Sequence, residues 1–203
     1  MFNCHCIALA HLMHSWLQSL ENTTSVIRIL LIDFSKAFDL VDHNILLNKV
    51  SDIGTPTFLT SWIHSFICDR RQRVKIGKTF SSWVNLNAGV PQGTLLGPAT
   101  FLLHINDLKT DCRSVKYVDD TTIWEACDKK RLNSKIQITA NQACTWCQKN
   151  NMKINTDKTK EMIIYFSKTV SNIEPILMND SKLEQVSHTK LLGVIIHWHR
   201  MIM

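Results

Sequence analysis

The chain has 203 residues, which is enough for one or two domains with a sizeable core. Hydrophobic residues make up 45% of it, an ordinary share for a globular protein. Lys and Arg outnumber Asp and Glu by 23 to 17, and the resulting formal charge of +6 suits a nucleic-acid partner without requiring one.

Neither a signal peptide nor a transmembrane segment is evident in the sequence. Segment 1–12 is partly apolar, but it lacks a basic start and contains His5 and His11. No uninterrupted apolar run approaches the ~20 residues that span a bilayer. We therefore expect an intracellular protein, in the nucleus or the cytoplasm, with no membrane partner.

The seven cysteines are odd in number, which in an intracellular chain indicates reduced thiols rather than a disulfide framework. Cys4 with Cys6, and Cys144 with Cys147, raise the alternative of a structural zinc site, which needs two closely spaced pairs. The first pair is spaced too tightly, and the two pairs are far apart in the sequence. Cys144 and Cys147 also fit one face of a helix. The zinc site is therefore the weaker interpretation.

The first half of the chain alternates helical and strand patterns. Apolar residues recur at helical spacing over 7–20. Segment 26–33 is rich in branched apolar residues and predicts a buried strand that ends at Asp33. Asp42 is placed to cap a helix over 43–50. Further elements predicted in this half are a helix over 57–69, a basic hairpin over 70–86 that turns near Gly77 and Lys78, and a loop over 89–98 that opens a helix over 99–108.

The second half begins with a short hairpin, 114–118 and 121–126, that flanks Asp119 and Asp120. A helix over about 129–150 follows, then a strand over 161–166 and another over 191–196. Helices and strands thus alternate irregularly, with hairpins among them. This pattern favours an α+β or mixed α/β fold over a helical bundle or an all-β sandwich.

Two acidic clusters are candidates for chemistry. Asp33 lies at the carboxyl end of an apolar strand, where mixed sheets place ligands. Its alternative role is a strand-end residue satisfied by local backbone donors, with Asp39 or Asp42 as helix caps. Asp119 and Asp120 could reach one site if they lie at a tight hairpin, or they could be an exposed acidic turn. Together, the three carboxylates could hold a pair of Mg²⁺ ions, which prefer hard oxygen ligands.

Two loops are further candidates. Three glycines and two prolines within 89–98 indicate a shaped loop in which backbone approaches something closely, and Gln92 is polar in the middle of it. Loop 155–160 carries Lys158, which could neutralise a triphosphate or donate a proton. On composition alone, Lys158 fits a solvated connecting loop better.

Several motifs, in chain order, resemble those of reverse transcriptases: DFSKAFD, AGVPQGTLLGP, INDL, YVDD, INTDKTK and KLLGV. DFSKAFDLVDH and GVPQGTLLGP are similar to the enzymes of non-LTR (LINE-type) retrotransposons in particular, because retroviral enzymes share the YxDD core without these flanks. The resemblance extends from about Ile7 to Ile196. It implies a polymerase palm, a small sheet backed by helices, with a partial fingers region and no thumb.

The resemblance also implies residue roles. Asp33 and Asp119 would bind two catalytic Mg²⁺ ions, for which Mn²⁺ is a possible substitute, with Asp120 in support. Phe38 would reject a ribose 2′-hydroxyl, Gln92 and Gly93 would touch the incoming nucleotide, and Lys158 would assist pyrophosphate departure. Leu192 and Gly193 would lie in a primer-grip hairpin. From their charge alone, Arg70, Arg71, Arg73 and Lys75 form a basic hairpin that either neutralises primer or template phosphates or is a solvated ribbon.

Departures from the family pattern leave two hypotheses. Val118 stands where a small residue is usual, and His104 where an apolar or aromatic one is. The ends predict a truncated chain: a remnant fingers helix and linker over 1–27, palm with partial fingers over 28–196, and a short tail over 197–203. The first hypothesis is an RNA-directed DNA polymerase core acting on an RNA template, a DNA primer and deoxynucleoside triphosphates. The second is a catalytically inactive retrotransposon remnant, at most a basic nucleic-acid-binding protein. A maturase-like or telomerase-like relative is a weaker third possibility.

Overall fold

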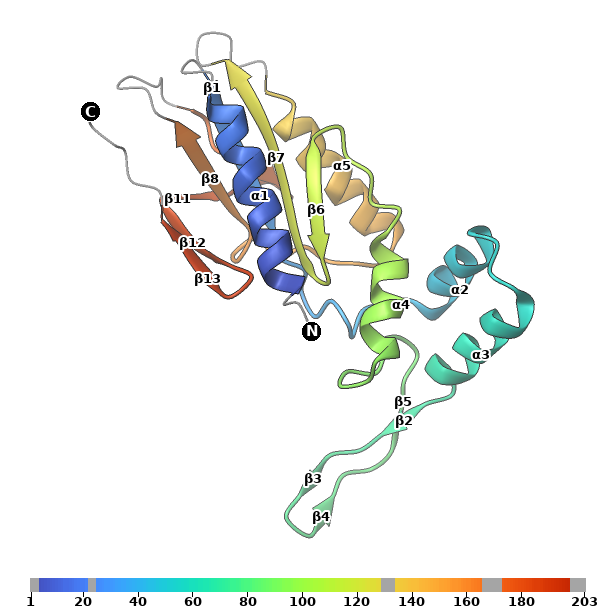
Figure 1. Ribbon diagram of the computed structural model, residues 1–203. Coiled ribbons are helices and arrows are strands. Elements are labelled where there is room, and N and C mark those ends of the chain that lie inside the picture. The colour runs from blue at the N-terminus through green and yellow to red at the C-terminus, as the bar shows by residue number, and fades with distance from the viewer. Residues whose placement is uncertain (1–3, 22–24, 129–133, 166–172, 198–203) are drawn as a thin grey trace. The chain divides into compact units, whose positions relative to one another are not determined.

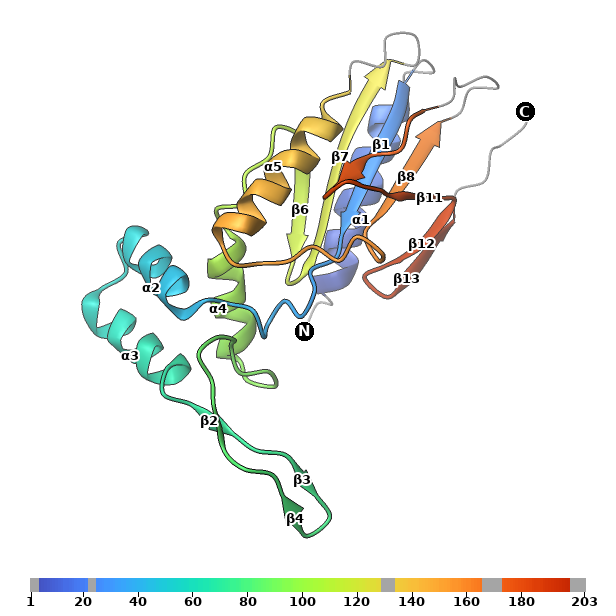
Figure 2. The same cartoon turned by 180° about the vertical axis from the view of Figure 1, so that it is seen from behind.

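The computed structural model of the chain describes residues 4–21, 25–128, 134–165 and 173–197 (Figures 1 and 2). The structure divides into two compact units. The sheet unit comprises Met1–Phe34, Thr110–Trp146 and Ile154–Met203, and the helical unit comprises Ser35–Lys109 and Cys147–Lys153. The tail predicted over 197–203 lies outside the described residues except for His197. The boundary predicted at residue 27 stays a prediction.

The sheet unit is built on a five-stranded sheet with the strand order β11-β8-β1-β7-β6. Its central strand pairs antiparallel with the neighbours on both sides, while β11 pairs parallel with β8. The central strand is the branched apolar segment expected to be buried, and it ends one residue before Asp33. The strands are β1 Ser25–Ile32, β6 Arg113–Tyr117, β7 Asp120–Asp128, β8 Lys160–Tyr165 and β11 Glu184–Val186.

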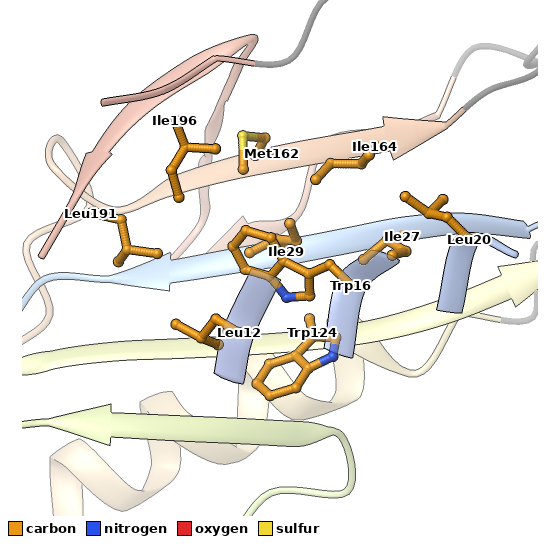
Figure 3. Close-up of a cluster of buried hydrophobic side chains, with 10 residues drawn as sticks. All are labelled: Leu12, Trp16, Leu20, Ile27, Ile29, Trp124, Met162, Ile164, Leu191 and Ile196. Carbon is orange, nitrogen blue, oxygen red and sulfur yellow. The ribbon is translucent and has the colours of Figure 1, made fainter. Parts of the chain in front are cut away.

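Helix α1, Cys4–Leu20, covers one face of this sheet, as its apolar stripe predicts (Figures 1 and 3). Leu12 and Trp16 are each only 1% exposed because they pack onto side chains of β1, β7 and β8. Alternation along β1 directs every second residue to this face, among them Ile27 and Ile29. Figure 3 shows this cluster: Leu12, Trp16, Leu20, Ile27, Ile29, Trp124, Met162, Ile164, Leu191 and Ile196.

Helix α5, Ile136–Lys149, lies on the other side of the sheet (Figure 2). Its start differs from the prediction, because Lys135 is not helical and residues 129–133 lie outside the described part of the chain. The cause is Glu125 of β7, whose carboxylate accepts the backbone N–H groups of Lys135 and Ile136 at 3.0 Å. A carboxylate that accepts free N–H groups can set where a helix begins, and here the preceding strand, β7, holds that carboxylate.

The segment expected as one strand over 191–196 is instead a hairpin. Strands β12, His188–Leu191, and β13, Val194–His197, pair antiparallel. Leu192 and Gly193 form the two-residue turn, with φ of 49° and 85°. Positive φ at both central residues is the twist that suits a tight hairpin, so the glycine decided the outcome over the apolar run. A second small hairpin consists of β9, Leu177–Met178, and β10, Ser181–Lys182.

The helical unit contains α2, His43–Asp52, α3, Thr57–Ile67, and α4, Leu96–Ile105. The predicted cap is confirmed, because the Asp42 side chain accepts the N–H groups of Asn44 and Ile45. Helix α4 begins three residues before the expected start. There the Thr94 hydroxyl accepts the N–H of Gly97 at 3.0 Å, which satisfies a donor in the first turn.

The predicted basic hairpin is confirmed in the helical unit. It is formed by β2, Arg71–Gln72, β3, Lys75–Ile76, β4, Thr79–Phe80, and β5, Val84–Asn85. The chain turns at Gly77, whose φ is 59°. The mixed α/β content agrees with the expected fold class. Among the described residues, no helix has the length and apolar character required to cross a bilayer.

Candidate active site

Asp33 directly follows β1, the central strand of the sheet unit. Its backbone is held on both sides by loop 155–159: its N–H donates to the Thr159 hydroxyl at 3.1 Å, and its carbonyl accepts the N–H of Asn155 at 2.9 Å. Thr159 is fully buried. The position of Asp33 is therefore determined by the strand before it and by a loop more than a hundred residues later.

Asp119 and Asp120 lie at the β6–β7 hairpin, as expected. Tyr117 pairs with Asp120, which leaves Val118 and Asp119 as a two-residue turn. Val118 has a φ of 55°, a left-handed conformation that is costly for a β-branched residue. In this turn one carboxylate comes from the loop tip and the next from the first residue of the strand, so both side chains are available at one end of the sheet.

The register of β1 with β7 relates these carboxylates to Asp33. The last pair of the antiparallel ladder is Ile32 with Thr121. Asp33 follows Ile32 and Asp120 precedes Thr121, so these two carboxylates lie at the same end of the two strands, just beyond the last pair. Opposite residues of an antiparallel pair project to the same face. Ile29 and Leu31, which precede Asp33 by four and two residues, project to the face of the sheet that α1 covers.

A pocket of about 330 Å³ opens beside the acidic turn. Its walls are formed by Tyr117–Asp120 from one hairpin and by Leu192 and Gly193 from the turn of the β12–β13 hairpin. The structure thus brings together the acidic turn and the residues expected to hold a primer, which are over seventy positions apart in sequence. Asp33 is not one of the lining residues.

The carboxylates of the acidic turn could provide some, but not all, of the ligands of a hard divalent cation. Within the described part of the chain, no group of three or more His, Cys, Asp or Glu side chains is close enough to hold a metal ion. A Mg²⁺ ion in a phosphoryl-transfer site needs only one or two carboxylates, because water and substrate phosphates complete its octahedron. Asp119 and Asp120, which are adjacent in the acidic turn and line the pocket, supply that number of carboxylates.

Lys158 is exposed on the same loop that holds Asp33. Its backbone N–H donates to Asn155, to the carbonyl oxygen and to Oδ1, both at 3.3 Å. Asn155 and Thr159, which bracket this lysine, are the residues that bond to the Asp33 backbone. The structure therefore places an exposed cationic side chain on the loop that is bonded to the candidate metal ligand.

A second pocket, of about 510 Å³, lies in the helical unit and contains the other predicted loop. Gln92 Nε2 donates to Asp39 Oδ1 at 3.2 Å across it. The backbone of Val90 also donates to the Phe38 carbonyl at 2.8 Å, so the glycine-rich loop is bonded to the segment after Asp33. The walls include Lys36, Asp39, Arg70, Gln72 and Gly89–Gln92.

Phe38 and Gly93 were expected at the nucleotide site, and neither lines this pocket. Phe38 is half-buried and packs on Phe101 with ring centroids 5.0 Å apart. Gly89 explains the need for glycine in the loop: a Cβ there would be 3.0 Å from the Asp39 carbonyl oxygen, at a φ of 88°. The close approach that the glycines predicted is thus to the chain's own backbone.

The four cations expected to contact primer or template belong to the basic hairpin. Arg71, Arg73 and Lys75 are exposed along it, while Arg70 at its base lines the 510 Å³ pocket. Sequence analysis did not single out Lys36 or Tyr117 as pocket residues or Thr159 as a support for Asp33. The sequence could have indicated these residues only through their motifs: Lys36 lies in DFSKAFD, Tyr117 in YVDD and Thr159 in INTDKTK.

Comparison with known proteins gives a consistent family. A family model described as reverse transcriptase (RNA-dependent DNA polymerase) matches residues 4–196. The probable RNA-directed DNA polymerase from transposon BS of Drosophila melanogaster is 30% identical over 177 residues, which cover 80% of this chain and 19% of that protein. The RNA-directed DNA polymerase from mobile element jockey of the same organism is 27% identical over 190 residues, 88% of this chain and 20% of that protein. The chain therefore spans about a fifth of the length of these relatives.

Among solved structures, the apo telomerase of Candida tropicalis, truncated from its C-terminal domain, superposes with a TM-score of 0.61. The identity is 16%, and the match covers 93% of this chain and 38% of the telomerase chain. At that identity the match concerns the fold, and it agrees with a polymerase palm.

Proposed function

Because the chain belongs to the reverse transcriptase family, with relatives of the LINE type, we propose that it forms the catalytic core of an RNA-directed DNA polymerase. The substrates are a DNA primer paired to an RNA template, and deoxynucleoside triphosphates. The relation of the acidic turn to Asp33 across the β1–β7 ladder is the observation that supports this proposal most.

The reaction is a phosphoryl transfer. The primer 3′-oxygen forms a bond to the α-phosphorus of the triphosphate, the bond from that phosphorus to the bridging oxygen breaks, and pyrophosphate leaves. Two Mg²⁺ ions, or Mn²⁺ in their place, held by Asp33 and Asp119 with Asp120 in support, would make the primer hydroxyl more acidic and offset the triphosphate charge. The remaining contribution of the protein is to position the two reactants.

The pocket beside the acidic turn is suited to the primer end. Leu192 and Gly193 form its opposite wall, so a sugar and phosphate seated against them are directed toward Asp119 and Asp120. The turn glycine leaves backbone exposed without a side chain, which allows close approach of a nucleic-acid backbone.

The 510 Å³ pocket is suited to the nucleotide. Lys36 and Arg70 provide cationic donors for phosphates, and Gln92 provides an amide. Phe38 and Gly93 do not line this pocket, but each directly adjoins a lining residue, Asp39 and Gln92; we assign Phe38 to exclusion of a ribose 2′-hydroxyl and Gly93 to approach of the loop to the base. Lys158 donates a proton to, or neutralises, the departing pyrophosphate. Arg71, Arg73 and Lys75 neutralise phosphates of the template or primer.

Primer extension by the purified full chain tests this proposal. A labelled DNA primer on an RNA template, supplied with deoxynucleotides and Mg²⁺, should be lengthened by the wild-type chain. The Asp119→Ala variant should lose at least ~100-fold in rate, because a metal ligand acts on the transition state itself. Asp52→Ala is the matched control, because Asp52 is an exposed carboxylate at the end of α2. This variant should extend the primer as the wild type does.

Two results would contradict the proposal. Equal extension by the wild type and Asp119→Ala would show that the acidic turn is not the catalytic site. Absence of extension by a folded wild-type chain, with or without Mn²⁺, would favour the inactive remnant instead.

A further inference from the structure

The basic hairpin, residues 70–86, carries aromatic rings among its cations. It contains five Arg and Lys residues and no Asp or Glu. Phe80 is 46% exposed and Trp83 is 55% exposed, although large aromatic side chains are normally among the more buried ones. Both rings belong to the ribbon that extends away from α3 and α4 of the helical unit (Figures 1 and 2). Two exposed aromatic rings on a positively charged ribbon are a candidate binding surface for a negatively charged partner with flat apolar groups.

The rings and the cations occupy one face of the ribbon. Arg71 and Arg73 lie over the Trp83 ring, and Arg73 and Lys75 lie over the Phe80 ring, so the three cations and both rings share one side. Phe80 is directly opposite Lys75 in the β3–β4 ladder and therefore shares that side. The hairpin stays paired between its two ladders, because Ser81 N–H donates to the Val74 carbonyl at 2.9 Å.

Arg73 is stacked on both rings. Its guanidinium carbon lies 4.0 Å from the centroid of Phe80 and 4.5 Å from that of Trp83. Lys75 Nζ lies 5.5 Å from the Phe80 centroid. Stacking uses the flat face of a guanidinium and leaves its in-plane N–H groups free to meet a phosphate. The cation thus orders two rings whose side chains would otherwise lose entropy on binding.

We propose that this face, with Phe80 and Trp83 as platforms and the arginines beside them, binds an unpaired nucleic-acid strand by stacking on its bases. A positive ribbon interleaved with exposed rings is the arrangement that holds single strands with little regard to sequence. A duplex offers phosphates equally well, but its base faces are already stacked on one another. The rings therefore favour a single strand, which the charges alone do not.

The residues at the start of the basic hairpin indicate which nucleic-acid strand binds to it. Arg70 and Gln72, at the start of the ribbon, line the 510 Å³ pocket assigned to the incoming nucleotide. The strand that leaves that pocket unpaired is the part of the RNA template not yet copied. This identification of the strand rests on the proposed polymerase function, whereas the stacking itself does not.

Binding of a labelled, unstructured RNA of about 12 nucleotides by the full chain tests the inference, with no metal or deoxynucleotide present. Trp83→Ala should bind the single strand about 10- to 100-fold more weakly, and its affinity for a duplex should change less than twofold. Trp83→Phe should restore most of the binding, and Trp83→Leu should not, because leucine keeps apolar area without a flat face. Trp62→Ala is the matched control, because Trp62 on α3 is also an exposed tryptophan, at 57%. This variant should bind RNA as the wild type does.

Salt titration separates the rings from the charges. Arg71→Ala should reduce the slope of log affinity against log salt by about 0.7, because one phosphate contact is lost. Trp83→Ala should leave the slope unchanged while lowering affinity at every salt concentration. The inference is wrong if Trp83→Ala weakens duplex and single-strand binding equally, or if the chain binds DNA strands but no RNA. It is also wrong if Trp83→Ala leaves RNA binding unchanged and instead dissociates a dimer of the chain, as measured by sedimentation. Because this assay needs no catalysis, its failure leaves Asp119-dependent extension untouched, and the converse also holds.

Discussion

The backbone N–H of Asp33 donates to the hydroxyl of Thr159 at 3.1 Å, and Thr159 is fully buried. The candidate metal ligand is thus positioned by a side chain that has no contact with substrate in the proposed reaction. The positioning of Asp33 is the first feature that can be tested by substitution.

Thr159→Val keeps the shape of the side chain and removes the acceptor. We expect a loss of about 1–3 kcal/mol in the free energy of unfolding, because the Asp33 N–H loses its partner. The rate of primer extension should fall several-fold with little change in the KM for deoxynucleotides. Thr139→Val is the control: Thr139 is also fully buried and donates to Cys112 Sγ at 3.2 Å, so stability should fall while the extension rate per folded molecule stays constant. Equal rates for both variants would rule out a positioning role for Thr159.

Val118→Gly should stabilise the protein. Val118 has a φ of 55°, which glycine adopts without steric cost, so the free energy of unfolding should rise by about 1 kcal/mol. Asp180→Gly, in the β9–β10 turn at a φ of 63°, should give a smaller gain because Asp tolerates this conformation better. Urea unfolding of both variants measures the difference. A loss of stability in Val118→Gly would show that the valine side chain compensates for its backbone.

Gly97→Ala should disturb the 510 Å³ pocket to which we assign the nucleotide. A Cβ at Gly97 would lie 2.2 Å from the Pro91 carbonyl oxygen, so the loop that carries Gln92 must move. We expect a stability loss of about 1–3 kcal/mol and a higher KM for deoxynucleotides. Gly54→Ala is the control, because nothing lies within 4 Å of that Cβ and only its φ of 79° is strained. An unchanged KM in a folded Gly97→Ala chain would separate the loop from nucleotide binding.

Phe38→Ala should relax the choice of sugar. Its ring packs 5.0 Å from that of Phe101, so truncation should cost about 2 kcal/mol of stability and open space near the 510 Å³ pocket. Under the proposed function, incorporation of ribonucleotides relative to deoxynucleotides should increase at least tenfold. Phe58→Ala, at a residue that is 71% exposed, should change neither quantity. A ratio unaffected by Phe38→Ala would assign discrimination to another residue.

His104 should make the helical unit sensitive to acid. Burial, with Lys49 nearby, lowers the pKa of its imidazole to about 4. In the unfolded chain the pKa is about 6.5, so between these values the unfolded state binds the additional proton. Stability is therefore lost as the pH falls from about 6.5 toward 4, by roughly 2 kcal/mol at pH 5. Urea unfolding between pH 7 and pH 5 gives the free energy of unfolding of the wild type and of His104→Leu as a function of pH. The wild type should lose about 2 kcal/mol more than the variant over this range. Equal losses in the two proteins would contradict the prediction.

Several elements could be predicted from the sequence because their causes are local. The strand before Asp33, the Asp42 cap and the hairpin at Gly77 each depend on residues within a few positions of one another. The start of α5 could not be predicted from helical periodicity, because it is set by Glu125, a side chain of the preceding strand and not of the helix itself. At Leu192 the apolar pattern predicted a continuous strand, whereas the family resemblance implied a hairpin, and the structure has the hairpin.

The candidate site shows the same division. From the residues alone it follows which carboxylates are present, that Asp119 and Asp120 lie at a hairpin turn, and that the surrounding motifs resemble those of reverse transcriptases. The tertiary structure brought Asp33 and Asp120 to the same end of β1 and β7, and it placed Leu192 and Gly193 in one pocket with the acidic turn. The physical reason is that hairpin formation depends on neighbouring residues, whereas strand register and pocket walls depend on the packing of segments that are far apart in the chain.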